Sequence, residues 1–179
     1  MNMTDVSVKL DFSMVYEENF KYIYNFVYMH VLHKETAEDV TSDTFMKALD
    51  AYDRYDPELA AVRTWLCTIA RNTIINRQTS AAVRYEQASD ELPEPVENDN
   101  DPIGDHLKQY NINREVENIL SKLTQDEREL ISMRYGADIP VKDIADILGI
   151  APKACTERIR RLLAKCRKYS SVDNPSELE

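Results

Sequence analysis

The chain has 179 residues, of which 43% are hydrophobic, and a formal net charge of −10. This length allows one domain or two small ones, and only three glycines with few alternating apolar runs favour an all-helical fold. No apolar run approaches the roughly 18 residues of a membrane span. Three cysteines without metal-ligand spacing indicate reduced thiols, so we expect a cytoplasmic protein without membrane insertion.

The first predicted domain, residues 13–80, is a bundle of three helices. Its first helix is predicted from apolar residues at helical spacing, namely Tyr16, Phe20, Ile23, Val27 and Val31. A second helix follows from the same spacing of Ala37, Val40, Thr41, Thr44, Phe45, Ala48 and Leu49. A third begins near Ala61, with Trp65 and Leu66 expected in the core. Three helices of this length can bury one another.

The composition changes in residues 81–113, which carry eight acidic and two basic residues and include the run SDELPEPVENDNDPIGD. Such a segment cannot bury enough apolar surface to offset its chain entropy, so it is predicted to be a flexible acidic linker. Residues 170–179 are polar and are predicted to form a disordered tail.

The second predicted domain, residues 114–169, begins with a helix that is apolar at Val116, Ile119, Leu120 and Leu123. Thr124 followed by Glu127 opens the next helix with a capping pattern. Leu130, Ile131 and Met133 fill the apolar side of that helix.

The same domain ends in two short helices joined by a tight turn. The first has an apolar face from Val141 to Leu148 and ends at Gly149, which tolerates the left-handed conformation. Pro152 suits the first turn of the second helix, and the residues that face inward there are Cys155, Ile159 and Leu162. The rest of this helix is basic, which predicts a helix-turn-helix whose second helix enters a DNA major groove. The alternative is an αα-hairpin with a solvated basic face.

The overall charge conflicts with independent DNA binding. Residues 114–169 carry twelve basic and nine acidic residues, and they form the only predicted domain with a positive balance. Neutralisation of phosphates drives DNA affinity, so the chain alone is expected to bind DNA weakly. A larger partner that holds the DNA would resolve the conflict.

Two passages carry a resemblance to a known family. They are AEDVTSDTF followed by WLCTIARN, and LSKLTQDERELISMRYG followed by the helix-turn-helix. In this order they resemble the two domains of a bacterial RNA polymerase sigma factor of the extracytoplasmic-function (ECF) group. The resemblance implies a sigma factor that binds core RNA polymerase, opens promoter DNA at the −10 element and reads the −35 element, with an anti-sigma protein as a further partner. The acidic linker would then either mimic nascent RNA in the polymerase or serve as a solvated spacer.

Carried onto this chain, the polymerase-docking surface is the exposed face of the second helix, with Asp39, Ser42 and Asp43. Acids at these positions suit a basic coiled coil of the polymerase, which provides steering and register. The family usually carries Gln-Glu where this chain has Ser42 and Asp43, so the shorter side chains are expected to weaken docking. Without the resemblance, a solvated acidic helix face is the simpler interpretation.

The resemblance places −10 recognition on the first domain. Strand opening needs aromatic and small polar groups that receive unstacked bases, and Asn72 matches a position in such a pocket. Three arginines of the third helix are expected to hold phosphates. The implied −10 residues are Tyr52, Tyr55, Arg63, Arg71, Asn72 and Arg77.

The −35 residues lie on the helix that begins at Pro152. Thr156, Glu157 and Arg160 match base-facing positions, where Arg160 suits guanine and Glu157 suits the amino group of cytosine. The phosphate-facing or flanking positions are Lys153, Arg158 and Arg161. An ion pair between Glu157 and Arg161 is an equally open interpretation.

Two other functions remain open from the sequence: a sigma-like decoy that sequesters an anti-sigma protein without binding promoters, and a dimeric repressor. A repressor would need a dimerisation helix and a basic first domain, and neither is present. His30 and His33 lack a third metal ligand, and no phosphate loop or nucleophile motif occurs. We therefore expect no enzyme, metal site, cofactor or small-molecule substrate.

Overall fold

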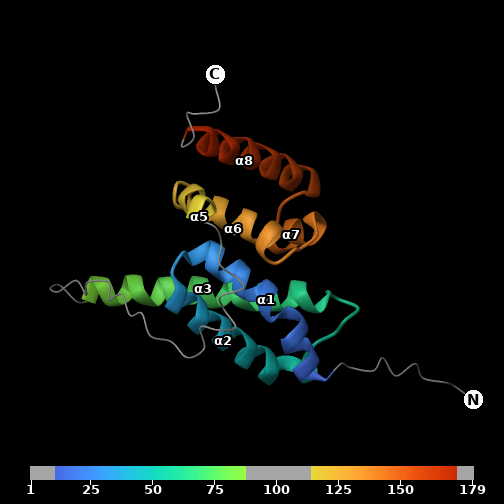
Figure 1. Cartoon of the computed structure of the whole chain (residues 1–179). Coiled ribbons are helices and arrows are strands. Elements are labelled where there is room, and N and C mark those ends of the chain that lie inside the picture. Colours follow the sequence, from blue (N-terminus) through green and yellow to red (C-terminus); the bar gives the residue numbers. More distant parts are fainter. Residues whose placement is uncertain (1–10, 88–113, 173–179) are drawn as a thin grey trace, which may run out of the picture.

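The computed structural model describes residues 11–87 and 114–172, and within these ranges the chain is all-α (Figure 1). The elements are α1 (Phe12–Val31), α2 (Lys34–Ala51), the short 3-10 turn η1 (Tyr52–Arg54), α3 (Val62–Gln87), α5 (Arg114–Ser121), α6 (Gln125–Ile131), the π-helical turn η3 (Ser132–Gly136), α7 (Val141–Leu148) and α8 (Pro152–Val172). The elements up to α3 form one small domain and those from α5 onward form another, which confirms the predicted fold class. No helix in the described ranges is both long and apolar enough to cross a bilayer.

Local signals set the ends of the helices. The carboxylate of Asp11 accepts a hydrogen bond from the backbone N–H of Ser13 at 3.2 Å and caps α1. Thr124 and Glu127 form the predicted capping box at the start of α6. Gly149 ends α7 with a φ of 64°, in the left-handed region. Because α8 then begins at Pro152, the predicted helix-turn-helix is confirmed.

The first domain buries one face of each helix. Its most deeply buried side chains include Ile23, Val27, Val40, Leu66 and Ile74. Two of the residues predicted to face inward do not do so, because Tyr16 and Leu49 are 43% and 50% exposed. Val15, which precedes Tyr16, is fully buried instead, whereas the predicted Ala48 is fully buried beside the exposed Leu49. The buried stripe of α1 is therefore rotated by about one residue from the predicted one at its start, and that of α2 is narrower than predicted at its end.

Two boundaries differ from the prediction. The helix α3 continues to Gln87, so residues 81–87 of the predicted linker are helical. Their sequence, AAVRYEQ, contains neither Gly nor Pro to stop a helix. The helix α8 continues to Val172, so it includes the first residues of the predicted tail. The remainder of the predicted linker and tail, residues 88–113 and 173–179, lies outside the described ranges.

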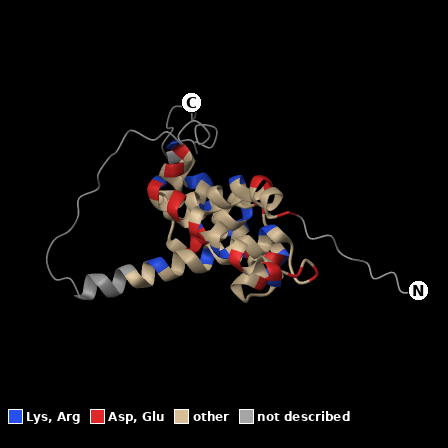
Figure 2. Cartoon of the chain, turned by 90° about the horizontal axis from the view of Figure 1, so that it is seen from below, with Lys and Arg blue, Asp and Glu red and all other residues tan. Residues whose placement is uncertain are grey.

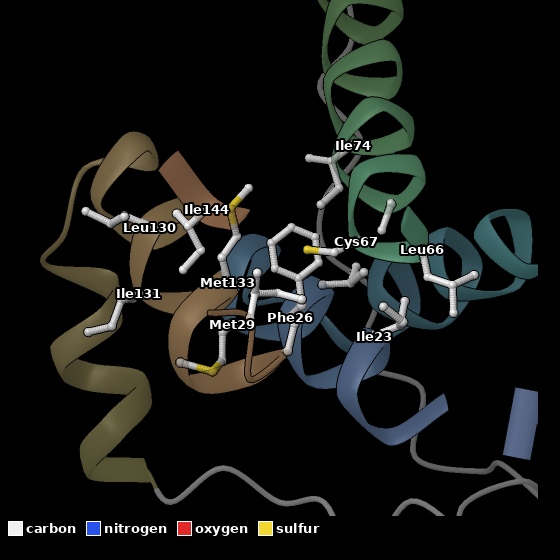
Figure 3. Packing of buried hydrophobic residues seen from close by; sticks show 14 of the residues in the cluster. Ile23, Phe26, Met29, Leu66, Cys67, Ile74, Leu130, Ile131, Met133 and Ile144 are labelled. Atoms are coloured by element: carbon white, nitrogen blue, oxygen red, sulfur yellow. The ribbon is translucent and has the colours of Figure 1, made fainter. Parts of the chain in front are cut away.

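The two domains share one hydrophobic core. In Figure 1 the second domain lies on one side of the first, with α6 and α7 facing it and α8 on the outer side. Phe26 and Met29 of α1 belong to the same buried cluster as Met133 of η3 (Figure 3). Ile139 of the following loop belongs to it as well. Gly136 closely approaches α1, because a Cβ atom there would lie 2.9 Å from the backbone nitrogen of Phe26. Glycine is the residue that permits this approach.

Candidate polymerase and nucleic-acid interfaces

The predicted docking acids share a partner on the neighbouring helix. Asp39 and Asp43 lie one turn apart on α2, and Ser42 is exposed beside them. Nη2 of Arg77, on α3, lies 2.6 Å from Oδ2 of Asp43, and Nη1 lies 3.4 Å from Oδ2 of Asp39. The hydrogen bond with Asp43 is the main cause of a raised pKa of the Arg77 guanidinium. Arg77, predicted to hold a phosphate, thus pairs here with the two acids of the docking face.

Tyr52 and Tyr55 lie in an aromatic cluster at the end of the three-helix domain. Their rings stack with centroids 5.9 Å apart, and the ring of Tyr55 lies 4.7 Å from that of Trp65. Phe12 closes the cluster at 5.2 Å from Tyr52. Burial is the main cause of the raised pKa of both tyrosines. The three rings of Tyr52, Tyr55 and Trp65 are half-buried and form a surface of the kind on which unpaired bases stack.

Two of the predicted phosphate-binding arginines face the second domain. Nε of Arg71 lies 2.7 Å from Oε1 of Glu129, on α6. Nη1 of Arg63 lies 3.5 Å from Oδ2 of Asp138, in the loop after η3. The guanidinium of Arg63 also lies over the ring of Tyr22, 3.5 Å from its centroid, in a cation–π contact. Both arginines therefore have carboxylate partners from the other domain.

Two further polar residues of α3 bear on the candidate site, one of them predicted from the sequence and one not. Asn72, predicted to receive an extruded base, is exposed, and its side chain makes no hydrogen bond within the described ranges. Thr64 was not predicted, because nothing in its sequence context separates it from other helical threonines. Its hydroxyl donates to Oδ2 of Asp143, on α7, at 2.7 Å. This is a third polar contact between α3 and the second domain.

The helix α8 presents the predicted −35 residues at the surface. Glu157 accepts two hydrogen bonds from Arg160, at 2.7 and 2.8 Å, and one from Nε of Arg161, at 2.9 Å. These bonds lower the pKa of Glu157 to about 2. The predicted ion pair of Glu157 with Arg161 is confirmed, and Arg160 is held by the same carboxylate. The exposed residues of the predicted set are Lys153, Thr156, Arg158, Arg160 and Arg161.

Cations predicted for the two promoter elements meet in one groove. The groove has a volume of about 500 Å³ and is lined by Arg71 of α3 and by Arg158, Arg161 and Lys165 of α8. Acids of α6 line it as well, and Nζ of Lys165 lies 2.7 Å from Oε2 of Glu127. Figure 2 shows the same interspersion of acidic and basic residues along the helices of the chain. The groove cations are therefore partly neutralised by acids of the same chain.

His30, which lacks the further ligands of a metal site in the sequence, is a buried residue of α1. His30 is 4% exposed, and neither ring nitrogen has a hydrogen-bond partner within the described ranges. Burial, followed by the nearby charges of Arg128 and Arg71, lowers the pKa of His30 to about 4. The imidazole is therefore neutral at physiological pH. Among the described residues, no three His, Cys, Asp or Glu side chains are grouped so as to hold a metal ion.

Comparisons with known proteins identify the family to which the chain belongs. The family model described as Sigma-70 region 2 matches residues 15–84, and that described as Sigma-70, region 4 matches residues 113–166, together more than half of the chain. The chain is 27% identical over 138 residues to the ECF RNA polymerase sigma factor BldN of Streptomyces coelicolor, covering 77% of this chain and 52% of BldN. It is 26% identical over 164 residues to the RNA polymerase sigma factor YlaC of Bacillus subtilis, covering 91% and 94% of the two chains.

A solved structure shows the same fold. The sigma factor RpoE in its complex with the anti-sigma factor NepR, from Bartonella quintana, gives a TM-score of 0.72 at 22% identity, covering 91% of this chain and 98% of that one. Two helical domains, the second with a helix-turn-helix, together with the two matched regions, define a sigma factor. The chain belongs to the sigma-70 family and, within it, to the ECF group.

Proposed function

We propose that the chain binds core RNA polymerase and directs it to specific promoters for transcription initiation. The observation that supports this most directly is the two-sided helix α8. Its inner side is buried at Cys155, Ile159 and Leu162, whereas Arg158 and Arg160 are exposed. A helix fixed in this way behind a tight turn presents its outer side to a major groove.

The two domains have different roles in this function. The first domain docks on the polymerase through the face of α2 that carries Asp39, Ser42 and Asp43. It opens the −10 element with the aromatic cluster and Asn72, and the second domain reads the −35 element with α8. Each task is a binding task, so the chain acts as a DNA-binding regulator without catalysis or a cofactor of its own.

An anti-sigma protein is a proposed further partner. The structure of RpoE from Bartonella quintana was solved in complex with the anti-sigma factor NepR. The chain shares the RpoE fold over most of its length, and we extend to it the expectation of an inhibitory partner protein.

The test is transcription in vitro from fragmented genomic DNA, with core polymerase alone and with core polymerase plus the full chain. Sequencing of the 5′ ends should reveal start sites that depend on the chain and share two upstream elements. Variants Arg160→Ala and Asn72→Ala should reduce these starts, whereas the exposed substitution Arg54→Gln should leave them unchanged. Binding of the chain to core polymerase without any new start site would contradict the proposal.

A decoy that sequesters an anti-sigma protein is the second candidate. The pairing of Arg77 with Asp39 and Asp43 favours it, because the docking acids are already partly neutralised within the chain. A decoy would bind the anti-sigma protein and yield no start sites in the transcription experiment. The two candidates therefore give opposite results in a single assay.

A further inference from the structure

A cavity lies between the three helices of the first domain and α6 of the second. It has a volume of about 190 Å³, and its polar lining consists of His30, Thr36, Arg77, Gln78, Gln125 and Arg128. A water molecule takes up only about 30 Å³ of the liquid. The cavity therefore has room for a polyatomic ion.

The charge of this lining is unusual for the chain. The formal net charge of the whole sequence is −10, yet among the described residues that line the cavity none is Asp or Glu. The groove between α3, α6 and α8 differs, because Asp126, Glu127 and Glu129 line it beside its cations. A cavity that contains cations and no carboxylate attracts an anion.

The two arginines of the cavity differ in their availability. The guanidinium of Arg77 already pairs with Asp43 at 2.6 Å. Arg128 makes no ion pair within the described ranges, and its Nη1 donates only a long hydrogen bond of 3.4 Å to the backbone carbonyl of Leu123. Nε of Arg128 is buried and has no hydrogen-bond partner in these ranges. The second domain thus contributes a cation with an unused donor.

The first domain contributes a second buried group of this kind. His30 is 4% exposed, and both of its ring nitrogens lack a hydrogen-bond partner among the described residues. A neutral imidazole carries one N–H donor, and a protonated one carries two. Buried polar groups in proteins are almost always paired with protein, water or an ion. Two unpaired donors, His30 and Arg128, therefore line one cavity from opposite domains.

We propose that this cavity binds a small tetrahedral oxyanion, of the size of phosphate or sulfate, with Arg128 and His30 as its main donors. Charge-assisted hydrogen bonds from a guanidinium are among the strongest that an oxyanion can accept. Nε2 of Gln125 donates to Oε1 of Gln78 at 2.5 Å and joins α6 to α3 at the exposed edge of the site. The site is independent of the proposed function, since neither main donor takes part in polymerase or promoter binding there.

Binding of the anion is coupled to a proton on His30. In the free chain, burial and then the charges of Arg128 and Arg71 lower the pKa of His30 to about 4, while Asp126 acts in the opposite direction. Arg77 of α3 is the further charged residue of the cavity lining. An anion beside the ring offsets these cations and favours the protonated imidazole, so the pKa of His30 rises in the complex. The complex then holds more protons than the free chain, and the affinity increases as the pH falls.

The test follows the site by NMR on the full chain, with sulfate as the probe. Proton–nitrogen correlation spectra of isotope-labelled histidine side chains report His30, whose signal is identified by its loss in the variant His30→Gln. Backbone amide spectra give the affinity of each variant. Sulfate keeps the same charge between about pH 6 and about pH 8, so any effect of pH on its binding belongs to the protein. A parallel titration with chloride at equal ionic strength is the control.

Sulfate should shift the His30 signal to saturation, and chloride should not. The affinity should be about fourfold higher at about pH 6 than at about pH 8, as expected if the pKa of His30 returns to its ordinary value in the complex. A response to sulfate that does not saturate, or one that chloride reproduces, would overturn the proposal and leave water as the occupant of the cavity.

Two arginine variants show whether the anion contacts Arg128. Arg128→Gln should weaken sulfate binding by about tenfold or more, because it removes a charge-assisted donor. Arg54→Gln makes the same charge change at an exposed position of η1 and should have no effect. Equal affinities of the two variants would overturn the proposal. If circular dichroism shows that Arg128→Gln is unfolded, Arg128→Lys takes its place. It keeps the charge without the Nε donor, and an affinity equal to that of the wild type would then overturn the proposal.

Two histidine variants show which ring takes up the proton. His30→Gln retains an N–H donor but does not titrate, so its affinity for sulfate should be the same at both pH values. The matched control is His33→Gln, at an exposed ring whose Nδ1 lies 2.9 Å from Oγ1 of Thr36 in the cavity lining. This control should retain the fourfold effect. A pH effect that persists in His30→Gln and disappears in His33→Gln would overturn the assignment to His30. Since these titrations contain neither polymerase nor DNA, absent start sites in transcription would count against the proposed function alone.

Discussion

The guanidinium of Arg77 bridges two acids of the neighbouring helix, with Asp43 at 2.6 Å and Asp39 at 3.4 Å. The sequence places Arg77 among the cations of α3 and the two acids on a separate docking face. In the folded chain these groups form one ionic cluster at the junction of α2 and α3. Any cation of a partner that docks on these acids must therefore compete with Arg77.

Replacing Arg77 with glutamine should strengthen the binding of core polymerase by several-fold. The substitution removes the internal competitor and leaves two exposed carboxylates free to attract a basic partner. Exposed ion pairs contribute only about 0.2–1 kcal/mol to stability, so the fold should persist. Binding is measured by surface plasmon resonance on immobilised core polymerase, and the gain should appear mainly in the association rate at low salt.

The matched control is Arg54→Gln, which makes the same charge change at an exposed arginine of η1. It should leave the association rate nearly unchanged. Weaker binding by Arg77→Gln than by Arg54→Gln would show that Arg77 orients the acids for docking. That result would contradict the role of competitor.

The helices and the helix-turn-helix could be predicted because their signals are local. The apolar spacing, the capping box at Thr124 and the stop at Gly149 each involve residues within about one or two turns. The ion pairs could not be predicted in the same way. Arg71 and Glu129 lie 58 positions apart, and Arg77 and Asp43 lie 34 apart. Nothing in the local pattern around a surface arginine shows whether its partner will be a phosphate or a distant carboxylate.

The packing of one domain on the other was also absent from the sequence interpretation. The residue of the sequence most directly related to this packing is Gly136, one of only three glycines in the chain. Gly136 is the last residue of η3, but its φ is not in the left-handed region that a helix-ending glycine adopts, so the end of the helix does not require glycine here. Such a glycine indicates a close backbone approach, but the sequence alone does not identify the other backbone.

Substituting Glu157 with glutamine should release the two arginines that it holds on α8. Binding to −35 DNA should then become tighter but less selective, because freed Arg160 and Arg161 can contact phosphates as well as bases. Arg160→Ala should instead reduce discrimination at one base pair by roughly ten- to a hundredfold. Holoenzyme binding to duplexes that vary at each −35 position measures both effects. Unchanged selectivity in both variants would exclude Glu157 and Arg160 from base readout.

Gly149→Ala should lower the free energy of unfolding by about 1–2 kcal/mol through the backbone alone. The φ of 64° disfavours any residue with a Cβ atom, while no atom outside residues 148–150 lies within 4 Å of the added methyl group. Gly149→Asn should lose less, since Asn tolerates this conformation better. Urea denaturation followed by circular dichroism compares the three proteins. An equal loss for Ala and Asn would indicate that a contact, and not the conformation of residue 149, sets the effect.

The buried imidazole of His30 should make the fold sensitive to mild acid. Its pKa of about 4 lies below the ordinary value of 6.5, so the unfolded chain takes up a proton as the pH falls below 6.5 while the folded chain does not. The stability present above pH 6.5 is therefore lost as the pH falls toward 4, with about 2 kcal/mol lost between roughly pH 7.5 and pH 5.

The variant His30→Phe retains an aromatic ring and cannot be protonated. The ring that it replaces lies beside Phe26, with the two ring centroids 6.1 Å apart. Urea denaturation of both proteins at the two pH values isolates this contribution from that of the carboxylates, which both proteins share. The wild type should lose about 2 kcal/mol more than the variant, and an equal loss in the two proteins would show that His30 is solvated when it takes up its proton.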